Sequence, residues 1–371
     1  MARQETNAAP PGDAHKQLAN LVCQHYDLGQ ICRLERIDLG YINVSYTLVM
    51  NKDGAVKQYL LRRYRTGTSE SRIKFEHALL AELEARGFSL APSLIPTRQG
   101  STYVKTTSLL RGLHKDYVAI FSYLPGEDRY SWHRPFCTAV ELKEAARVLA
   151  LYHNTITGWQ GIAEWQGPRI IDKIPWLPEK WQRQAQQAAN SSFDRLFLRE
   201  ADFLSTILTN PRYIPQRSIY DDLPHLAIHG DYHPGNLKFS GRAITGLFDF
   251  DWAEMDARCF DVGLALMYFC CSWELNSNGD LLVDKIQTFM QSYQESAQDI
   301  GQLGPLSIAE LQHLPKMIFA ADAHIIDWTI NDYYHFRSDP DQCPLYFQHG
   351  VNLLKWLERN WTALSLLSRD L

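Results

Sequence analysis

The stretch LAIHGDYHPGNLKFSGRAITGLFDFDWAEMDARCFDV, residues 226–262, decides the expected fold and function of the chain. It holds two apolar, strand-like segments, Leu226–Ile228 and Ile244–Phe248, and each runs directly into acidic residues. Strands that end in carboxylates on a loop are a common way to hold catalytic groups at the edge of a rigid core. The loops after these two strands are therefore the first candidates for a catalytic site.

Three polar residues in these loops have a spacing that is typical of kinases. Asp231 and Asn236 are five residues apart, and Asn236 and Asp249 are thirteen apart. Asp-x-x-x-x-Asn followed by Asp-Phe matches the protein-kinase order of catalytic-loop Asp, metal-binding Asn and metal-binding Asp. We expect Asp231 to accept a hydrogen bond from a substrate hydroxyl and to take its proton. The oxygens of Asn236 and Asp249 suit Mg²⁺ better than Zn²⁺.

The same stretch resembles the aminoglycoside phosphotransferase and choline kinase superfamily, whose hallmark reads HGDxHPGN followed by IDFxxA. The matching segments here are HGDYHPGN (229–236), FDFDWA (248–253) and FDVGLAL (260–266), the last being similar to the family's DLA segment. The resemblance implies a small-molecule kinase that uses ATP and Mg²⁺. It also implies an α+β, two-lobed protein-kinase-like fold, with a small antiparallel-sheet N-lobe that has one main helix and a larger, mostly helical C-lobe.

One branch of the superfamily is most similar to this chain. Its likeness rests on a Glu-His pair in the first main helix, on APSLIPTRQG (91–100) and on FDVGLALMYFCCSWE (260–274). This branch contains type II homoserine kinases, hydroxylysine kinases and a stress-response Ser/Thr kinase. The resemblance makes homoserine the leading acceptor, with an aminoglycoside or a choline- or ethanolamine-type alcohol as the alternative.

The resemblance also assigns nucleotide-binding residues in the N-lobe. YLLRRY (59–64) is similar to the family's third strand, whose cation holds the α and β phosphates, and Arg62 takes that position. Strand alternation alone does not decide whether Arg62 or Arg63 is the phosphate-binding cation, because their side chains point to opposite faces of the strand. Glu76 takes the place of the partner glutamate.

A second nucleotide contact is implied before Pro125-Gly126. The segment Ser122–Leu124 is similar to the family hinge, where backbone groups, here of Ser122 and Leu124, would bind adenine. Residues 39–46, with one Gly and small polar residues, take the place of the phosphate-covering loop.

Several roles remain open. Asp251 either touches the metal or substrate or has no such role. His229 is expected to brace the loop, whereas His229-x-Asp231-x-His233 could also indicate a transition-metal hydrolase, although Pro234-Gly235 interrupts the strand there. Asp261 is expected either to cap the helix that follows or, as in the family, to hold the catalytic loop. A catalytically silent nucleotide-binding module is a further alternative.

The composition is that of an ordinary globular protein. The 371 residues are 45% hydrophobic and 21% charged, and the net charge is −5, so there is no reason to expect a nucleic-acid or anionic-membrane partner. The seven scattered cysteines predict reduced thiols and a cytoplasmic location. The N-terminus lacks the apolar core of a signal peptide, and Val262–Cys271 is too short to cross a bilayer. The expected partner is a small hydroxyl substrate, and the oligomeric state stays open.

Apolar periodicity and turn residues divide the chain into three parts: a flexible tail (1–15), an N-lobe (16–123) and a C-lobe (124–371). In the N-lobe we expect a helix near 15–26, strands at 33–39, 44–51 and 56–64, a helix at 69–86, and strands at 101–107 and 116–123. In the C-lobe we expect helices at 141–154, 180–208, 281–299, 309–335 and 350–367. The acidic and aromatic helix 320–334 either binds an amine-bearing substrate or is a solvated helix with one buried stripe.

Overall fold

The structure, a computed structural model, describes residues 11–37, 43–106, 116–163, 167–337 and 339–367. The chain divides into two compact units, which are described one at a time. Unit 1 falls within Met1–Glu84 and Ala91–Leu124, and unit 2 comprises Ala85–Leu90 and Pro125–Leu371. Residues 39–42 of the expected phosphate-covering loop lie outside the described residues.

Unit 1 is built on an antiparallel sheet in the order β1-β2-β3-β6-β4, with β5 also paired to β6. A tight turn at Asp53 and Gly54, both with positive φ, joins β2 to β3, as Asp-Gly between alternating runs predicts. The strands are β1 Gln30–Ile37, β2 Val44–Lys52, β3 Ala55–Arg63, β4 Leu94–Ile95, β5 Val104–Thr106 and β6 Asp116–Ser122.

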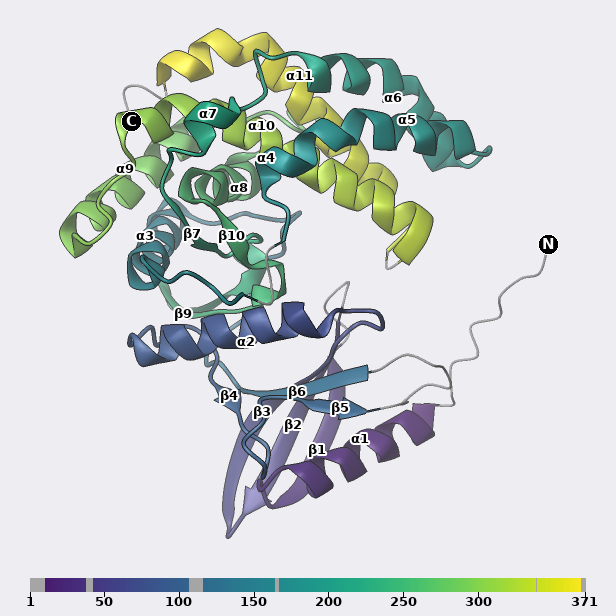
Figure 1. The fold of residues 1–371 in the computed structure, drawn as a ribbon, viewed down its shortest axis with the longest axis vertical. Coiled ribbons are helices and arrows are strands. Elements are labelled where there is room, and N and C mark those ends of the chain that lie inside the picture. The colour runs from purple at the N-terminus through teal and green to yellow at the C-terminus, as the bar shows by residue number, and fades with distance from the viewer. Residues whose placement is uncertain (1–10, 38–42, 107–115, 164–166, 338, 368–371) are drawn as a thin grey trace. The chain divides into compact units, whose positions relative to one another are not determined.

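Two helices pack on this sheet, α1 (Pro11–His25) and α2 (Glu70–Ala85) (Figure 1). Leu61 of β3 belongs to the apolar cluster under α1, whereas its neighbour Arg62 bonds to Glu76 of α2. Because successive side chains of a strand point to opposite faces, α1 and α2 cover opposite faces of the sheet.

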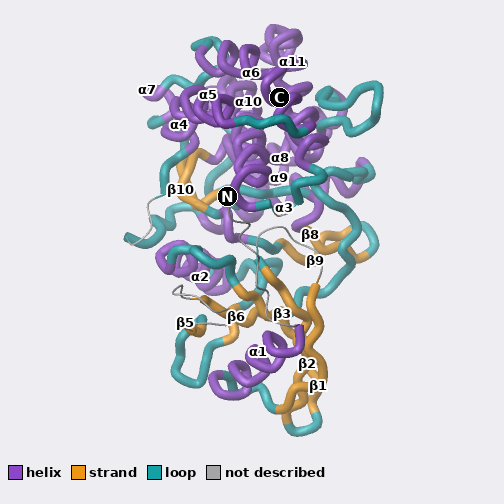
Figure 2. Tube along the Cα trace, turned by 90° about the vertical axis from the view of Figure 1, so that its right-hand side faces the viewer, coloured by secondary structure: helices purple, strands orange, loops and turns teal. Residues whose placement is uncertain are grey.

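Unit 2 is mostly helical, with two short antiparallel pairs, β7 with β10 and β8 with β9 (Figure 2). Its strands are β7 His225–Ile228, β8 Leu237–Ser240, β9 Ala243–Leu247 and β10 Glu254–Ala257. Its main helices are α3 Ala139–Ile156, α5 Leu177–Gln187, α6 Ser192–Thr209, α8 Arg258–Cys270, α9 Val283–Ile300, α10 Ile308–Asn331 and α11 Cys343–Leu367, and the short α4 and α7 are Ile170–Lys173 and Arg217–Tyr220.

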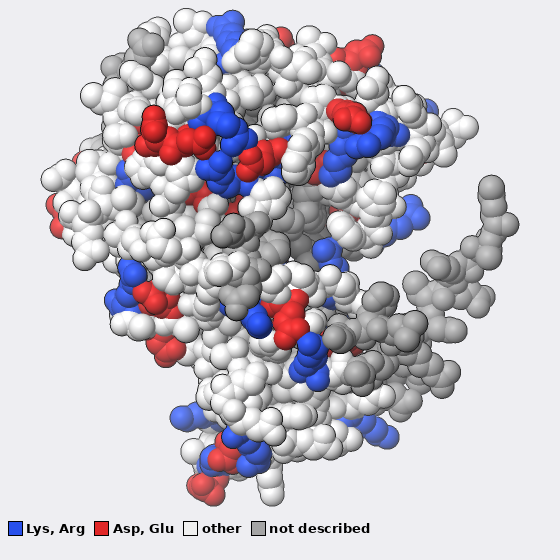
Figure 3. All heavy atoms as spheres, viewed as in Figure 1, with Lys and Arg blue, Asp and Glu red and all other residues white. Residues whose placement is uncertain are grey.

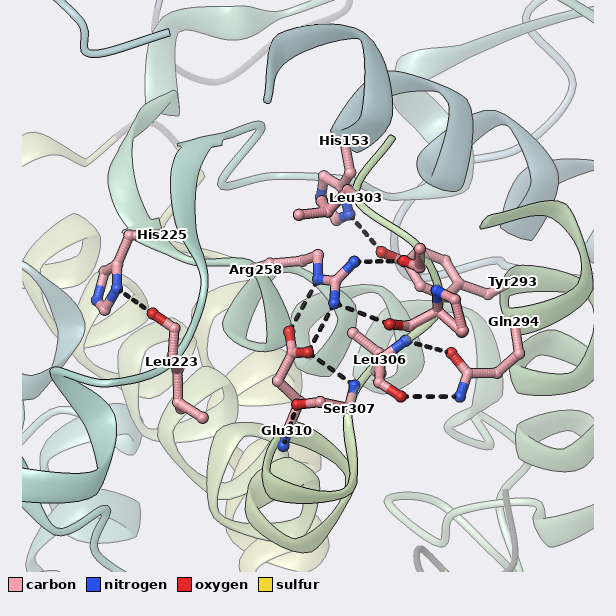
Figure 4. A network of polar contacts seen from close by, with 12 residues as sticks. His153, Leu223, His225, Arg258, Tyr293, Gln294, Leu303, Leu306, Ser307 and Glu310 are labelled. Atoms are coloured by element: carbon pink, nitrogen blue, oxygen red, sulfur yellow. Dashed lines mark hydrogen bonds and ion pairs between the residues drawn. The ribbon is translucent and has the colours of Figure 1, made fainter. Parts of the chain in front are cut away.

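The centre of unit 2 is α8, all of whose residues are buried. A Cβ on Gly263 would lie 2.8 Å from the backbone carbon of Met317, so glycine lets α8 approach α10 closely. The buried Arg258 guanidinium donates to both carboxylate oxygens of Glu310, at 2.8 and 2.6 Å, and to the carbonyl of Gly304 (Figure 4). The start of α8 is thereby tied to the start of α10.

Several expectations differ from the structure. The first helix begins at Pro11, so residues 11–15 belong to α1 and not to a tail. The helix expected at 180–208 is two helices, because Ser191 and Asp194 form a capping box that starts α6 anew. The two-residue strand β4 was not expected. Asp261 is not an N-cap, because α8 starts three residues earlier and its N-cap is Ala257.

Acidic and basic side chains are interspersed on the face drawn in Figure 3, in keeping with the near balance of charge in the sequence. Among the described residues, no helix combines the length and apolar character that a membrane span requires.

Candidate active site

The loop that follows β7 is shaped by glycine and held by a buried carboxylate. Gly230 has φ +75°, and a Cβ there would lie 2.4 Å from the carbonyl oxygen of Trp252, so only glycine fits. Asp261 of α8 accepts the backbone N–H groups of His229 and Gly230, at 2.8 and 3.0 Å. Asp261 therefore holds the loop, as the family resemblance implies.

Asp261 is itself held from behind. The Nε2 atom of His153 in α3 lies 3.0 Å from Asp261. Its Nδ1 atom lies 2.8 Å from the Tyr293 hydroxyl (Figure 4). A carboxylate only accepts, so Nε2–H donates to Asp261 and Nδ1 accepts from Tyr293. Burial lowers the pKa of His153 despite the opposing pull of Asp261. The loop thus rests on a buried chain of hydrogen bonds from α9 through α3 to α8.

Asp231 lies in this loop with its carboxylate bonded on both oxygens. Tyr268 of α8 donates to Oδ1 at 3.0 Å, and the Asn236 amide donates to Oδ2 at 3.1 Å. His233 Nε2 lies 3.4 Å from Oδ2, and the Asp231 side chain keeps 20% of its surface exposed. Burial raises the pKa of Asp231, but His233, His229 and Tyr268 lower it by more, so the net pKa is below its usual range. The carboxylate is therefore ionised, oriented and still accessible.

Asn236 and Asp249 are brought to the same loop by the β8–β9 pair. Leu237 pairs with Leu247, and the Phe248 N–H donates to the Asn236 carbonyl at 3.0 Å. The Asn236 amide nitrogen is used by Asp231, so a cation would have to bind the amide oxygen. Asp249 has a left-handed backbone (φ 68°, ψ 60°), which is rare for a residue other than glycine and often found at functional sites.

The two histidines of the loop are committed to hydrogen bonds. His229 Nε2 donates to the Phe248 carbonyl at 3.1 Å and its Nδ1 accepts from the Asp231 N–H. His233 Nδ1 accepts from the Gly235 N–H at 3.0 Å. Within the described ranges, no group of three His, Cys, Asp or Glu side chains is placed to hold a metal. The transition-metal alternative gains no support, and His229 braces the loop.

Unit 1 brings the predicted pair Arg62 and Glu76 together. Arg62 of β3 and Glu76 of α2 are 5% and 2% exposed, and their Nη1 and Oε1 atoms lie 3.0 Å apart. Arg62 also lies over the Phe121 ring, at 5.4 Å. The sequence did not decide between Arg62 and Arg63, and Arg62 is the one in this ion pair.

Ser122 and Leu124 lie at and just beyond the end of β6. The Ser122 N–H donates to the Ser93 carbonyl at 2.8 Å, and its hydroxyl accepts from the Ser93 N–H at 2.9 Å. The N–H and the hydroxyl of Ser122 already have hydrogen-bond partners. An adenine ring at this segment would have to bind other backbone groups of Ser122 or those of the residues after it.

A cluster of aromatic side chains adjoins Asp231 through Tyr268; we call Trp132, Tyr268, Trp273 and Tyr346 the aromatic cluster. The Trp132 ring lies 6.4 Å from Tyr268, 5.5 Å from Trp273 and 4.1 Å from Tyr346. His349 stacks on Trp273 at 3.5 Å, and burial lowers the pKa of His349 to about 3, so that imidazole is neutral. Trp132 and Trp273 are only half-buried.

The helix at 320–334 does not present the row of free acids that an amine site would need. Asp327 accepts from Lys180 and Trp181 of α5, at 2.7 and 2.9 Å. Asp322 is buried, and burial raises its pKa well above the usual range, so it is a neutral acid. Asp327 is thus paired with α5, and Asp322 lies in the core.

Sequence reasoning missed Tyr268, the aromatic cluster and the residues behind Asp261. Tyr268 lies seven residues, two helical turns, after Asp261, so a helical template through Asp261 would have placed both on one face. Trp132 and Tyr346 come from distant segments, and no local pattern joins them.

Comparison with known proteins identifies the family. The model of the phosphotransferase enzyme family matches residues 33–285, which is more than half of the chain. The chain belongs to this family. It is thus a phosphotransferase of the small-molecule kinase class, and the expected family and enzyme class are confirmed.

Relatives and solved structures agree with the fold. A homoserine kinase from Bradyrhizobium sp. (strain ORS 278) is 27% identical over 308 residues, 82% of each chain. A microcompartment-associated aminopropanol kinase has a TM-score of 0.63 at 19% identity and covers 95% of this chain and 99% of its own. An amicoumacin kinase in complex with AMP-PNP and Ca²⁺ has a TM-score of 0.63 at 13% identity, over 92% and 93%. The α+β, protein-kinase-like fold class is confirmed.

Proposed function

We propose that this phosphotransferase transfers the γ-phosphate of ATP, with Mg²⁺, to the hydroxyl of a small amino alcohol, and that homoserine is the leading acceptor. The observation that carries the proposal is the Asp231 carboxylate, which is ionised, fixed on both oxygens by Tyr268 and Asn236, and partly exposed. A group in this state can orient an acceptor hydroxyl and receive its proton.

In this proposal the acceptor oxygen forms a bond to the γ-phosphorus while the bond from phosphorus to the ADP oxygen breaks. The hydroxyl proton passes to Asp231. When bound, Mg²⁺ neutralises charge on the phosphates. The Asn236 oxygen and the Asp249 carboxylate are hard ligands that fit Mg²⁺ and would hold it. Arg62, kept in place by Glu76, would bind phosphate oxygens, and Ser122 and Leu124 would contact adenine.

The aromatic cluster supports an acceptor with an ammonium group. Ring faces attract cations, and Trp does so most strongly. The neighbouring Asp231 is anionic and His349 is neutral, so neither repels a cation. The names of the relatives, a homoserine kinase and an aminopropanol kinase, point to the same class of acceptor.

A cytoplasmic location is part of the proposal. All seven cysteines are free thiols in the structure, and Cys137, Cys259, Cys270, Cys271 and Cys343 are buried. Reduced thiols and a supply of ATP are both typical of the cytoplasm.

The test is ADP release from Mg²⁺-ATP with paired acceptors. L-Homoserine is compared with 4-hydroxybutanoate, which lacks the amine, and 3-aminopropan-1-ol with butan-1-ol, in which a methyl group replaces the ammonium. Choline, ethanolamine, hydroxylysine and an aminoglycoside complete the panel. We expect turnover only with the amines and none with Asp231→Asn.

Turnover with neutral alcohols at the same efficiency would contradict the amino-alcohol acceptor. Nucleotide binding with no turnover on any acceptor would favour the silent binding module.

A further inference from the structure

Behind the Arg62–Glu76 pair lies a chain of buried hydrogen bonds in unit 1. The Tyr64 hydroxyl lies 2.8 Å from Glu76 Oε2 and 2.9 Å from His77 Nε2. His77 Nδ1 lies 2.7 Å from the Thr102 hydroxyl. Tyr64, Glu76 and His77 are all buried. A series of hydrogen bonds therefore runs from Thr102 through His77 and Tyr64. It ends at Oε2 of Glu76, whereas Arg62 binds Oε1.

The chemistry of the groups fixes the direction of this chain. A carboxylate only accepts, so the Tyr64 hydroxyl donates to Glu76 and its oxygen accepts from His77 Nε2–H. Burial, with a further contribution from Arg62, lowers the pKa of His77 to about 3, so the ring is neutral and has a single N–H. Nδ1 then accepts from the Thr102 hydroxyl. All three hydrogen bonds point toward Glu76, and bonds aligned in this way polarise one another.

The backbone geometry allows Arg62 and Tyr64 to bind the two oxygens of Glu76 at the same time. Arg62 lies near the end of β3 and Tyr64 follows the strand directly, two residues later, so their side chains lie on the same face. One binds Oε1 of Glu76 and the other binds Oε2. His77, next to Glu76 on α2, then ties Tyr64 to the loop before β5 through Thr102.

We propose that Tyr64 and His77 are positioning residues that lock Glu76, and through it Arg62, in the arrangement that binds the phosphates of ATP. This inference rests on the proposed function. Without the Tyr64 hydroxyl, Glu76 keeps a buried carboxylate oxygen with one partner fewer, and the carboxylate can turn away from Arg62 to find another.

The experiment is displacement of a fluorescent ATP analogue by Mg²⁺-ATP, together with steady-state kinetics, on Tyr64→Phe. We expect the Kd and KM for ATP to rise about tenfold, the loss of one buried, charge-assisted hydrogen bond, while the KM for the acceptor stays within about twofold. Combining Tyr64→Phe with Glu76→Gln should add little to Glu76→Gln alone, because both act through the same carboxylate.

Tyr26→Phe is the matched control. Tyr26 is a buried tyrosine of the same unit, and its hydroxyl has no hydrogen-bond partner among the described residues. ATP affinity should stay as in the wild type. Thr102→Val, at the far end of the chain, is the milder second variant and should raise the KM for ATP by about two- to threefold.

A purely structural role gives a different result: Tyr64→Phe and Thr102→Val would lower the melting temperature while both keep wild-type ATP affinity. That outcome overturns the inference and leaves the proposed function intact. If the wild type itself fails to bind Mg²⁺-ATP, the proposed function fails first and the inference falls with it.

Discussion

A carboxylate that receives a proton from an acceptor hydroxyl must be ionised and held before the acceptor arrives. Asp231 meets both conditions because of its neighbours. Burial raises its pKa, but His233, His229 and Tyr268 lower it by more, and Tyr268 and Asn236 fix its two oxygens. Preorganisation of this kind reduces the reorientation that the reacting groups would otherwise need.

Tyr268→Phe tests this arrangement without removing the carboxylate. It deletes the donor to Oδ1, so we expect kcat to fall about tenfold with the KM for ATP nearly unchanged. Tyr232→Phe is the control, because it removes a buried hydroxyl of the same loop that donates to the Ala145 carbonyl instead. Equal losses of kcat in both variants would show that loop packing, and not the orientation of Asp231, sets the rate.

Asp249 has a different proposed task, and its removal should have a different signature. Asp249→Ala deletes a hard anionic ligand, so we expect the Mg²⁺ concentration for half-maximal activity to rise at least about tenfold. Titration of activity against Mg²⁺ at saturating ATP measures this value. An unchanged Mg²⁺ requirement would remove Asp249 from the metal site.

At the scale of elements, the buried ion pair of Arg258 and Glu310 connects α8 to α10. The loop that carries Asp231 depends on α8, because Asp261 of α8 holds it. Arg258→Met leaves Glu310 buried without its cation, and such a loss typically costs about 3–5 kcal/mol. Urea unfolding followed by circular dichroism measures the free energy of unfolding. Adding Glu310→Gln to Arg258→Met removes the unpaired buried charge and should restore part of the lost free energy of unfolding. A cost below about 1 kcal/mol for Arg258→Met would mean that packing alone joins α8 to α10.

Glu141, in the first turn of α3, should make the free energy of unfolding depend on pH. Burial raises the pKa of Glu141, but hydrogen bonds from Thr138, Tyr130 and Arg129 lower it by more, and the pKa falls from its usual 4.5 to about 2. Because the folded-state pKa is the lower one, Glu141 adds stability that is complete above pH 4.5 and is lost as pH falls toward 2. Its contribution is at most about 3 kcal/mol.

Glu141→Gln removes this titration. The variant should be less stable than the wild type at pH 7, and the difference in the free energy of unfolding should narrow below pH 4.5. The measurement is a series of urea unfolding curves from pH 7 to pH 3.5. A difference that is the same at pH 7 and pH 3.5 would rule out the linkage.

Sequence reasoning predicted those elements whose signals are local. The Asp53-Gly54 turn and the helix expected at 69–86 are examples, and so are the strands β7 and β9 that precede Asp231 and Asp249. It failed where the determining contact is distant or the signal is short. The Ser191–Asp194 capping box was present in the sequence, but no glycine or proline marks the break before α6. Trp132 and Tyr268 come together only through the packing of unit 2.

At the scale of the whole molecule, each of the two compact units contains residues that are proposed to bind the nucleotide. Arg62 and Glu76 belong to unit 1, and Asn236 and Asp249 belong to unit 2. A ligand that binds the folded protein alone stabilises it by RT ln(1 + [L]/Kd), about 2.7 kcal/mol at 100 times Kd. Mg²⁺-ATP should therefore stabilise the folded protein.

Differential scanning calorimetry measures this effect. We expect Mg²⁺-ATP to raise the melting temperature of the protein. EDTA should remove most of the shift, because Asn236 and Asp249 would then have no cation through which to hold the phosphates. Arg62→Gln, which keeps a polar side chain but loses the charge, should reduce the shift even with Mg²⁺ present. An unchanged melting temperature with Mg²⁺-ATP would contradict the proposed nucleotide-binding residues.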